Sequence, residues 1–170
     1  FHGLCNRMLR AHHRDAGLPQ LFQILDSADQ LAAVKRLLKG LNVDDEKFPP
    51  RDVVNFINGQ KEAGLRPDAA EAWDEYTRRR VELYREYEAQ CQREGVVDFA
   101  ELLLRSYELL QRNEPIRHHY QSRFRHILVD EFQDTNILQY RWLKLLAGGG
   151  AHLFCVGDDD QSIYAFRGAE

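Results

Sequence analysis

An apolar run that ends in two carboxylates, residues 127–131, is the feature that most constrains the fold. Ile127 to Val129 are apolar, and Asp130 and Glu131 follow directly. Such a run is typical of a strand buried in a parallel sheet, where ligands bind beyond the carboxyl ends of the strands. Successive strand residues point to opposite faces, so one carboxylate can hold a hydrated Mg²⁺ and the other can orient a water for attack on a phosphate. A helix cap in a solvated loop is the alternative interpretation.

The residues around this run predict a strand–helix–strand unit. We expect a strand at about 126–131, a helix at about 136–147 and, after three glycines, a second strand at about 153–156 that ends before Gly157 and Asp158. This order indicates parallel strands joined by a right-handed crossover. Two strands do not make a stable sheet alone, so we expect the rest of the sheet to lie outside this sequence.

The preceding residues, about 1–124, are predicted to be mainly helical, with a turn and an extended or irregular stretch at 15–25. Apolar residues recur at helical spacing in several segments, and capping-box pairs mark three of the starts. Glycines mark three of the ends. The expected helices are 4–14, Ser27 to Gly40, Pro50 to about Ala63, Asp68 to about Glu94, and Asp98 to Leu110. The expected capping pairs are Ser27 with Gln30, Asp68 with Glu71, and Asp98 with Glu101.

Composition narrows the class of protein. The 170 residues are 44% hydrophobic and 29% charged, as in ordinary globular proteins. No apolar run approaches the about 20 residues of a membrane helix. Three distant cysteines predict neither a zinc site nor a disulfide framework, and a reducing cytosol is the simplest compartment. A net charge of −4 argues against binding nucleic acid through bulk positive charge, although it leaves room for a local basic groove. A start at Phe1 rather than methionine leads us to expect an internal piece of a longer polypeptide, with a processed N-terminus as the alternative.

A polar loop that carries aromatic residues follows the second predicted strand. Gln161 is neutral and can both donate and accept hydrogen bonds, so it could contact a γ-phosphate or the attacking water. Tyr164 and Phe166 lie next to Arg167 in the sequence. Aromatic faces with arginine are what single-stranded nucleic acid needs for stacking. The alternative is that both aromatic residues belong to the core of the next element.

Both segments closely resemble motifs of superfamily 1 DNA helicases of the UvrD/PcrA/Rep group. Residues 130–136 read Asp-Glu-Phe-Gln-Asp-Thr-Asn and resemble motif II, and residues 157–168 resemble motif III. Phe1-His2-Gly3 resembles the end of a motif on the DNA path of that family. Residues 97–103, Val-Asp-Phe-Ala-Glu-Leu-Leu, resemble the short Asp-Phe motif ahead of motif II. The resemblance covers essentially the whole chain and is closest to the UvrD branch, on residues 22–26, 57–61 and 64–67.

The resemblance implies an α/β fold in which a helical subdomain is inserted into a RecA-like P-loop NTPase domain. Residues 1–118 would be the helical insertion with a flanking helix, and residues 119–170 would be a partial RecA-like ATPase core. This part of such a protein would be mostly helical, with two parallel strands near its C-terminal end.

The resemblance also implies roles for individual residues. Asp130 would bind Mg²⁺, and Glu131 would activate the attacking water. Gln161 would contact ATP and couple its hydrolysis to DNA binding, with Arg167 supporting both. The DNA-binding set would be Phe1, His2, Tyr164, Phe166 and Arg167. The family usually has tryptophan where this chain has Phe166, so stacking there would use a smaller aromatic face.

The implied parent is an ATP-dependent 3′→5′ helicase or translocase in DNA repair. Its partners would be single-stranded DNA, junctions of single and double strands, ATP with Mg²⁺, and repair proteins. It would act in the cytoplasm and would not bind a membrane. The chain has no Gly-x-x-x-x-Gly-Lys-Ser/Thr phosphate-binding loop, so we expect no ATP hydrolysis from the isolated chain. Two alternatives remain: a DNA- or protein-binding module without hydrolysis, and a subunit of a helicase–nuclease.

Overall fold

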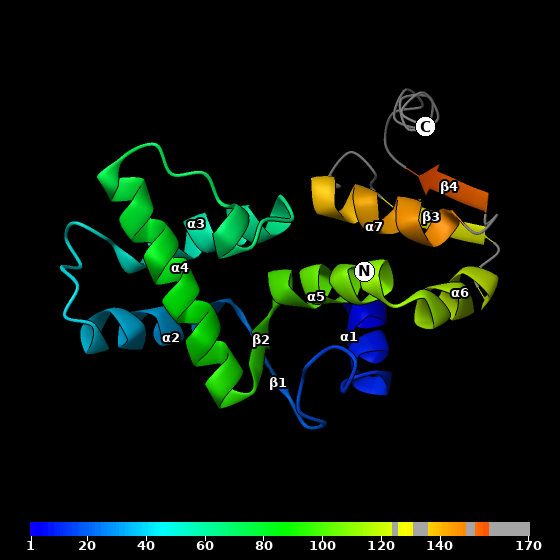
Figure 1. Ribbon diagram of the computed structural model, residues 1–170, viewed down its shortest axis with the longest axis horizontal. Helices are drawn as coiled ribbons and strands as arrows, with labels where there is room; N and C mark the ends of the chain where they lie inside the picture. Colours follow the sequence, from blue (N-terminus) through cyan, green and yellow to red (C-terminus); the bar gives the residue numbers. More distant parts are fainter. Residues whose placement is uncertain (124–125, 131–135, 149–151, 157–170) are drawn as a thin grey trace. The chain divides into compact units, whose positions relative to one another are not determined.

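A computed structural model describes residues 1–123, 126–130, 136–148 and 152–156, the two ranges 126–130 and 152–156 by their backbone alone. The chain is mostly helical and divides into two compact units, Phe1–Ser106 and Tyr107–Glu170 (Figure 1). The boundary at 118/119 implied by the resemblance concerns the domains of a longer protein, and it stays a prediction.

Three helices form a hydrophobic core in the first unit. They are α2 (Ser27–Gly40), α3 (Pro50–Glu62) and α4 (Glu75–Glu94), and each contacts the other two (Figure 1). Their apolar faces bury one cluster of side chains, because each helix carries apolar residues at helical spacing on one face. The buried members are Ala33, Val34, Leu37, Leu38, Phe48, Val53, Ile57, Leu83, Tyr84 and Tyr87.

The bounds of α2 match the prediction, but its N-cap lies one residue earlier than predicted. Asp26, not Ser27, is the N-cap: its Oδ1 accepts a hydrogen bond from the backbone N–H of Asp29 at 2.8 Å. The carboxylate of Asp29 in turn accepts from the N–H of Asp26, which completes a capping box. Because Asp26 supplies the cap oxygen, Ser27 is the first helical residue and Gln30 is left free to turn inward, where it is buried.

The predicted helix from Asp68 is wrong in its first turns. A short 3₁₀ helix, η1 (Pro67–Ala69), precedes an irregular stretch, and α4 begins only at Glu75. Asp74 is the actual cap and accepts from the N–H of Thr77 at 2.7 Å, whereas the carboxylate of Asp68 pairs with Arg85. Trp73 therefore lies outside the helix and is 84% exposed, not part of an apolar helix face.

A short parallel pair of strands joins the two ends of the segment that contains α2, α3 and α4. Strand β1 (Gln23–Leu25) pairs with β2 (Val96–Asp98) in the register Gln23 to Val96 and Leu25 to Asp98. The extended stretch was predicted, but its pairing was not, since it depends on residues about 70 positions apart in sequence (Figure 1). Gly95 ends α4 with φ of +66°, as predicted for a left-handed cap.

Two further helices flank β1 and β2 in sequence. Helix α1 (His2–Ala11) buries Cys5, Met8 and Leu9, and it begins and ends earlier than the predicted 4–14. Helix α5 (Phe99–Arg112) starts directly after β2, with Asp98 as the predicted cap.

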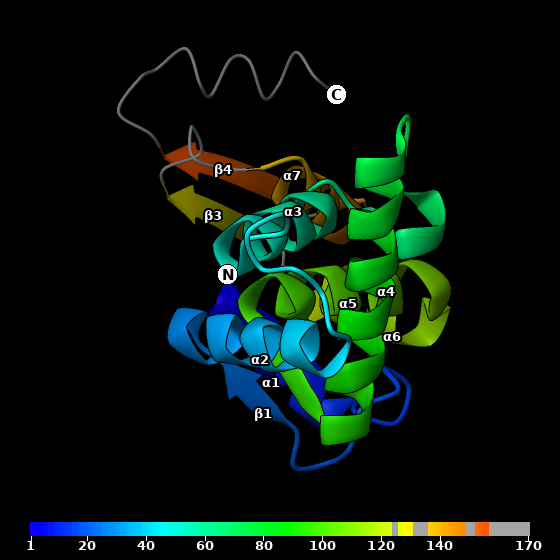
Figure 2. The ribbon, with the colours of Figure 1, turned by 90° about the vertical axis from the view of Figure 1, so that its left-hand side faces the viewer.

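The second unit contains the predicted strand–helix–strand pattern. Helix α6 (Glu114–Arg123) is followed by β3 (His126–Asp130), α7 (Ile137–Ala147) and β4 (His152–Val156). Strands β3 and β4 pair in parallel, which confirms that prediction (Figure 2). Helix α7 has a capping box between Asn136 and Gln139, and it buries Leu138, Trp142, Leu143 and Leu146. No helix in the part of the chain that the structure describes is long and apolar enough to cross a membrane.

Candidate functional site

The carboxylate predicted to bind a metal is the last residue of a parallel strand. Asp130 ends β3 in register with Val156, the last residue of β4. Both strands therefore present their carboxyl ends at the same edge, which is where open α/β sheets bind ligands. An aspartate at this edge suits a hard cation such as Mg²⁺, which prefers oxygen ligands. The other predicted residues of this site, Glu131, Gln161, Tyr164, Phe166 and Arg167, lie outside the described residues.

The two predicted DNA-contacting residues at the N-terminus are both exposed aromatic residues. Phe1 is 40% exposed, and His2, the first residue of α1, is exposed as well. The ring of His2 meets the ring of Phe99 edge to face, with centroids 5.7 Å apart. Phe99 is itself 44% exposed although it is a large apolar residue. Partial burial lowers the pKa of His2, so its ring is neutral at pH 7 and suited to stacking.

Phe99 is a candidate that the sequence analysis did not single out. The Asp-Phe motif was recognised, but its phenylalanine was not assigned to a surface. Nothing in the local sequence distinguishes an exposed phenylalanine at the start of a helix from a buried one. Only its place beside His2, which is distant in sequence, shows that both rings face the same patch. We call the contacting rings of His2 and Phe99, together with the exposed Phe1 next to His2 in sequence, the aromatic patch.

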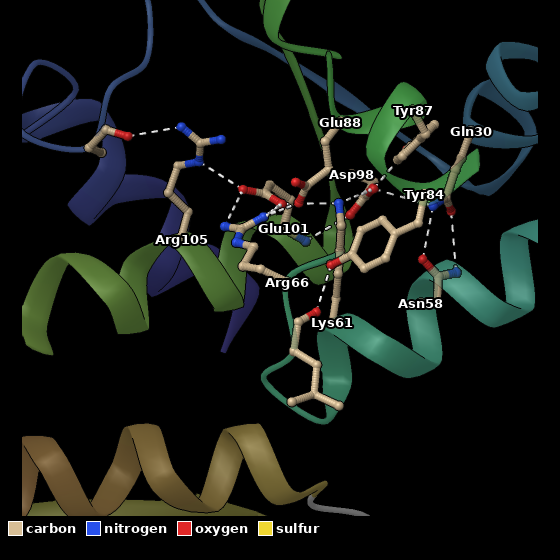
Figure 3. Close-up of polar contacts among 12 residues, drawn as sticks. Gln30, Asn58, Lys61, Arg66, Tyr84, Tyr87, Glu88, Asp98, Glu101 and Arg105 are labelled. Atoms are coloured by element: carbon tan, nitrogen blue, oxygen red, sulfur yellow. Dashed lines mark hydrogen bonds and ion pairs between the residues drawn. The ribbon is translucent and has the colours of Figure 1, made fainter. Parts of the chain in front are cut away.

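A buried ionic cluster is centred on Asp98, the residue that precedes Phe99 in the sequence (Figure 3). Its Oδ1 caps α5 by accepting from the backbone N–H of Glu101 at 2.7 Å. Its Oδ2 accepts from Lys61 Nζ at 2.8 Å, from the Tyr87 hydroxyl at 2.7 Å and from Gln30 Nε2 at 3.3 Å. These three donors come from α3, α4 and α2. Both oxygens of one carboxylate thus connect the helical core to the first turn of α5.

Glu101 is the second buried carboxylate of the cluster. Arg66 approaches it with two parallel hydrogen bonds, Nη1 to Oε1 at 2.8 Å and Nη2 to Oε2 at 2.9 Å. Lys61 Nζ lies 3.0 Å from Oε1, and Arg105 Nε donates to Oε2 at 2.8 Å. Arg66 also pairs with Glu88 of α4. The cluster has three cations, Lys61, Arg66 and Arg105, and three carboxylates, Glu88, Asp98 and Glu101 (Figure 3).

The pKa values show which charge states the cluster favours. Burial alone lowers the pKa of Lys61, but the adjacent carboxylates of Glu101 and Asp98 outweigh it and raise that pKa. Burial raises the pKa of Glu101, yet Lys61, Arg66 and Arg105 together hold it well below its usual range. For Glu88 burial outweighs Arg66, and the pKa is raised. Lys61 and Glu101 are therefore charged at neutral pH, which is consistent with a fully paired cluster.

The cluster reaches beyond α5 to the loop that follows α1. Arg105 Nη1 donates to the carbonyl oxygen of Ala16 at 2.9 Å. In the same region Gln92 Nε2 donates to the carbonyl oxygen of Gly17 at 3.3 Å. These bonds connect α5 and α4 to the segment between α1 and β1. The sequence predicted the cap by Asp98 but not the burial of Lys61, since a lysine in a polar helix is ordinarily exposed.

The three consecutive arginines of α4 divide between two environments. Arg79 Nη1 pairs with Glu82 at 2.8 Å on the exposed helix face, a solvated pair. The guanidinium of Arg80 instead covers the rings of Phe56, at 4.4 Å, and Tyr76, at 5.0 Å. Arg78 and Arg79 also line an open hollow of about 670 Å³ together with Lys47, Phe48, Glu75, Tyr76 and Glu82. This arrangement favours a structural role for Arg80 and leaves a mixed-charge surface around Arg78.

Comparison with known proteins places this arrangement in a family. The model of the UvrD/REP helicase N-terminal domain matches residues 1–170, the whole chain. The chain belongs to the UvrD/REP helicase family. It is 54% identical over 171 residues to DNA helicase II of Haemophilus influenzae and 54% identical over 173 residues to DNA helicase II of Escherichia coli. It is 38% identical over 172 residues to the ATP-dependent DNA helicase PcrA of Staphylococcus aureus. Each comparison covers 100% of this chain and 24% of the relative.

Family membership confirms the resemblance drawn from motifs II and III. The chain corresponds to a part of longer helicases, because it spans 24% of the length of these relatives. The roles of the individual site residues stay predictions.

Proposed function

We propose that this chain is part of an ATP-dependent DNA helicase or translocase that moves along single-stranded DNA. The observation that carries the proposal is the 54% identity to DNA helicase II across the full chain, which includes the segments that resemble motifs II and III. Two features of the described structure support it: a carboxylate at the end of a parallel strand, and a patch of exposed aromatic rings.

The residues proposed for ATP binding and hydrolysis belong to the second unit. Asp130 would hold Mg²⁺ at the carboxyl end of β3, and Glu131 would act as the base toward water. A bound Mg²⁺–ATP would supply the phosphoryl group and the charge neutralisation that its transfer requires. Gln161 and Arg167 would contact the nucleotide and relate its state to DNA binding. These four assignments follow from the matched motifs.

The proposed binding of single-stranded DNA depends on stacking of bases against aromatic rings. Phe1, His2 and Phe99 offer exposed rings, and Tyr164 and Phe166 would add two more from motif III. Each base has a stacking face, so such contacts bind single strands without regard to sequence. Arg167 would add a positive charge near the backbone. A net charge of −4 agrees with binding that depends on local contacts more than on bulk charge.

Finer features of the proposal come from the family resemblance. They are 3′→5′ movement, action at junctions of single and double strands, a role in DNA repair with repair proteins as partners, and a cytoplasmic location. The fold proposal belongs with them: residues 1–118 as a helical insertion and residues 119–170 as part of a RecA-like core.

The test is ATP hydrolysis by the full-length protein that contains this chain, with and without single-stranded DNA. We expect strong stimulation by DNA and its loss in the Glu131→Gln variant, with ATP and DNA binding retained. Glu62→Gln is the matched control, because it makes the same change at an exposed position of α3 and should leave hydrolysis unchanged. Steady-state hydrolysis that survives Glu131→Gln would reject Glu131 as the base. A wild-type protein without hydrolysis would favour a binding module instead.

A further inference from the structure

The carboxylate of Asp98 does two different things with its two oxygens. One oxygen, Oδ1, fixes the first turn of α5 through the N–H of Glu101. The other, Oδ2, is held by Lys61, Tyr87 and Gln30. A carboxylate is planar and rigid, so holding Oδ2 also fixes the direction of Oδ1. The orientation of the first turn of α5 is therefore set by three helices of the core.

Phe99 is the residue that this geometry controls most directly. It follows Asp98 in the chain and is the first residue of α5. Its ring lies against His2 at the start of α1, with centroids 5.7 Å apart. A rotation of the first turn of α5 would move the Phe99 ring away from His2 and break up the aromatic patch.

We propose that Lys61 is a positioning residue for single-stranded DNA: by holding Asp98 it orients the first turn of α5 and keeps Phe99 and His2 together as a surface for stacking. Lys61 does not itself contact DNA, since its side chain is only 2% exposed. The proposal rests on the proposed function, because it assigns a role within the aromatic patch.

A charged residue is needed here because its interactions are directional. An apolar side chain of the same size would fill the space behind Asp98, but hydrophobic contact does not fix an orientation. Replacement of a buried ion pair by apolar groups is often neutral or stabilising, so stability alone does not explain a buried lysine. Lys61 Nζ instead lies 2.8 Å from Asp98 Oδ2 and 3.0 Å from Glu101 Oε1, so that one ammonium group bridges both carboxylates.

The experiment uses the full-length protein and measures the affinity for a labelled oligothymidine by fluorescence anisotropy. The first variant is Lys61→Met, which keeps most of the length of the side chain and removes its charge. We expect its affinity to fall about fivefold, the lower end of what the loss of one stacked base costs. ATP hydrolysis should then need more DNA for half-saturation, while kcat at saturating DNA stays unchanged. That division separates misplacement of the aromatic patch from damage to the catalytic centre.

A double variant tests whether Lys61 acts through Asp98. Lys61→Met combined with Asp98→Asn removes both charges, and the amide oxygen of Asn can still accept from the N–H of Glu101. We expect Asp98→Asn alone, Lys61→Met alone and the double variant to lose affinity for oligothymidine to a similar extent, because the two side chains act as one pair. The matched control is Arg36→Met, which makes a similar change in the exposed ion pair with Glu94 and should not alter affinity.

Tyr87→Phe keeps the test decisive if Lys61→Met does not fold. It removes one donor to Asp98 Oδ2 and preserves the ring, so the fold should survive. We expect a loss of affinity in the same direction, of about twofold to threefold, because one of the three donors is gone.

Folded Lys61→Met with wild-type affinity would overturn the proposal. So would folded Tyr87→Phe with wild-type affinity, or a double variant whose loss of affinity is the sum of the two single losses. Wild-type protein that binds oligothymidine without DNA-stimulated hydrolysis would reject the proposed function alone, and wild-type protein that does not bind it would reject both.

Discussion

Lys61 and Asp98 form an ion pair 2.8 Å long in which the two side chains are only 2% and 1% exposed. They are 37 positions apart in sequence and belong to α3 and to the end of β2. The pair connects the helical core to α5, so loss of either side chain should disturb both the core and the first turn of α5.

Removal of Asp98 should strongly destabilise the first unit. Asp98→Ala leaves the Lys61 ammonium buried with Glu101 as its main partner and removes the cap of α5. We expect the free energy of unfolding to fall by about 3–5 kcal/mol, the usual cost of breaking a buried pair from one side. Asp98→Asn should cost less because it keeps the cap. Urea unfolding followed by circular dichroism measures both variants, and equal losses would contradict the role of the cap.

Phe99 should contribute to DNA binding more than to stability. We expect Phe99→Ala in the full-length protein to weaken binding of single-stranded DNA by about 1–3 kcal/mol, the value of one stacked base. The free energy of unfolding should change little, since the side chain is 44% exposed. Trp73→Ala is the control: it removes a more exposed aromatic residue that lies outside the patch. An equal loss of affinity in both variants would show a general effect of surface aromatics.

Acid should weaken the fold through Glu101. Its pKa is lower in the folded chain than in the unfolded one, because Lys61, Arg66 and Arg105 outweigh its burial. The stability that it contributes is present above the unfolded pKa of about 4.3 and is lost as the pH falls below that value. Urea unfolding between pH 7 and pH 3 should therefore show a decline that Glu101→Gln reduces.

Glu88 provides a control for that experiment, because its pKa shifts in the opposite direction to that of Glu101. Burial raises its pKa in the folded chain, so its protonation favours the folded state as the pH falls toward the unfolded pKa. Glu88→Gln should therefore make the acid decline steeper, while Glu101→Gln makes it shallower. Changes in the same direction for both variants would contradict the assigned pKa directions.

Two glycines should respond oppositely to alanine. Gly95 has φ of +66°, and a Cβ there would lie 3.2 Å from Pro19 Cγ, so Gly95→Ala should cost about 1–2 kcal/mol. Gly59 lies inside α3 with nothing within 4 Å of an added Cβ, so Gly59→Ala should stabilise by about 0.5–1 kcal/mol. Thermal unfolding of both variants checks the signs, and a neutral Gly95→Ala would contradict the left-handed cap.

Much of the fold could be predicted from local signals. The strand–helix–strand order at 126–156 and the ends of α3 and α4 follow from apolar periodicity, proline and glycine. The predicted capping residues were less reliable, because neighbouring polar residues compete for the same cap. Asp26 took the place of Ser27, and Asp74 took the place of Asp68. In each case the residue whose oxygen reaches the third helical N–H determined where the helix begins.

The sequence by itself determined the family and the residues proposed for nucleotide chemistry, because motifs are local and their order along the chain is enough to recognise them. Only the tertiary structure decided that Lys61 is buried against Asp98 and that Phe99 meets His2. Each of these pairs joins residues far apart in the chain. These contacts depend on the pairing of β1 with β2 and on the packing of α2, α3 and α4. Burial of the Lys61 charge is favourable only because that packing brings its partner within hydrogen-bond distance.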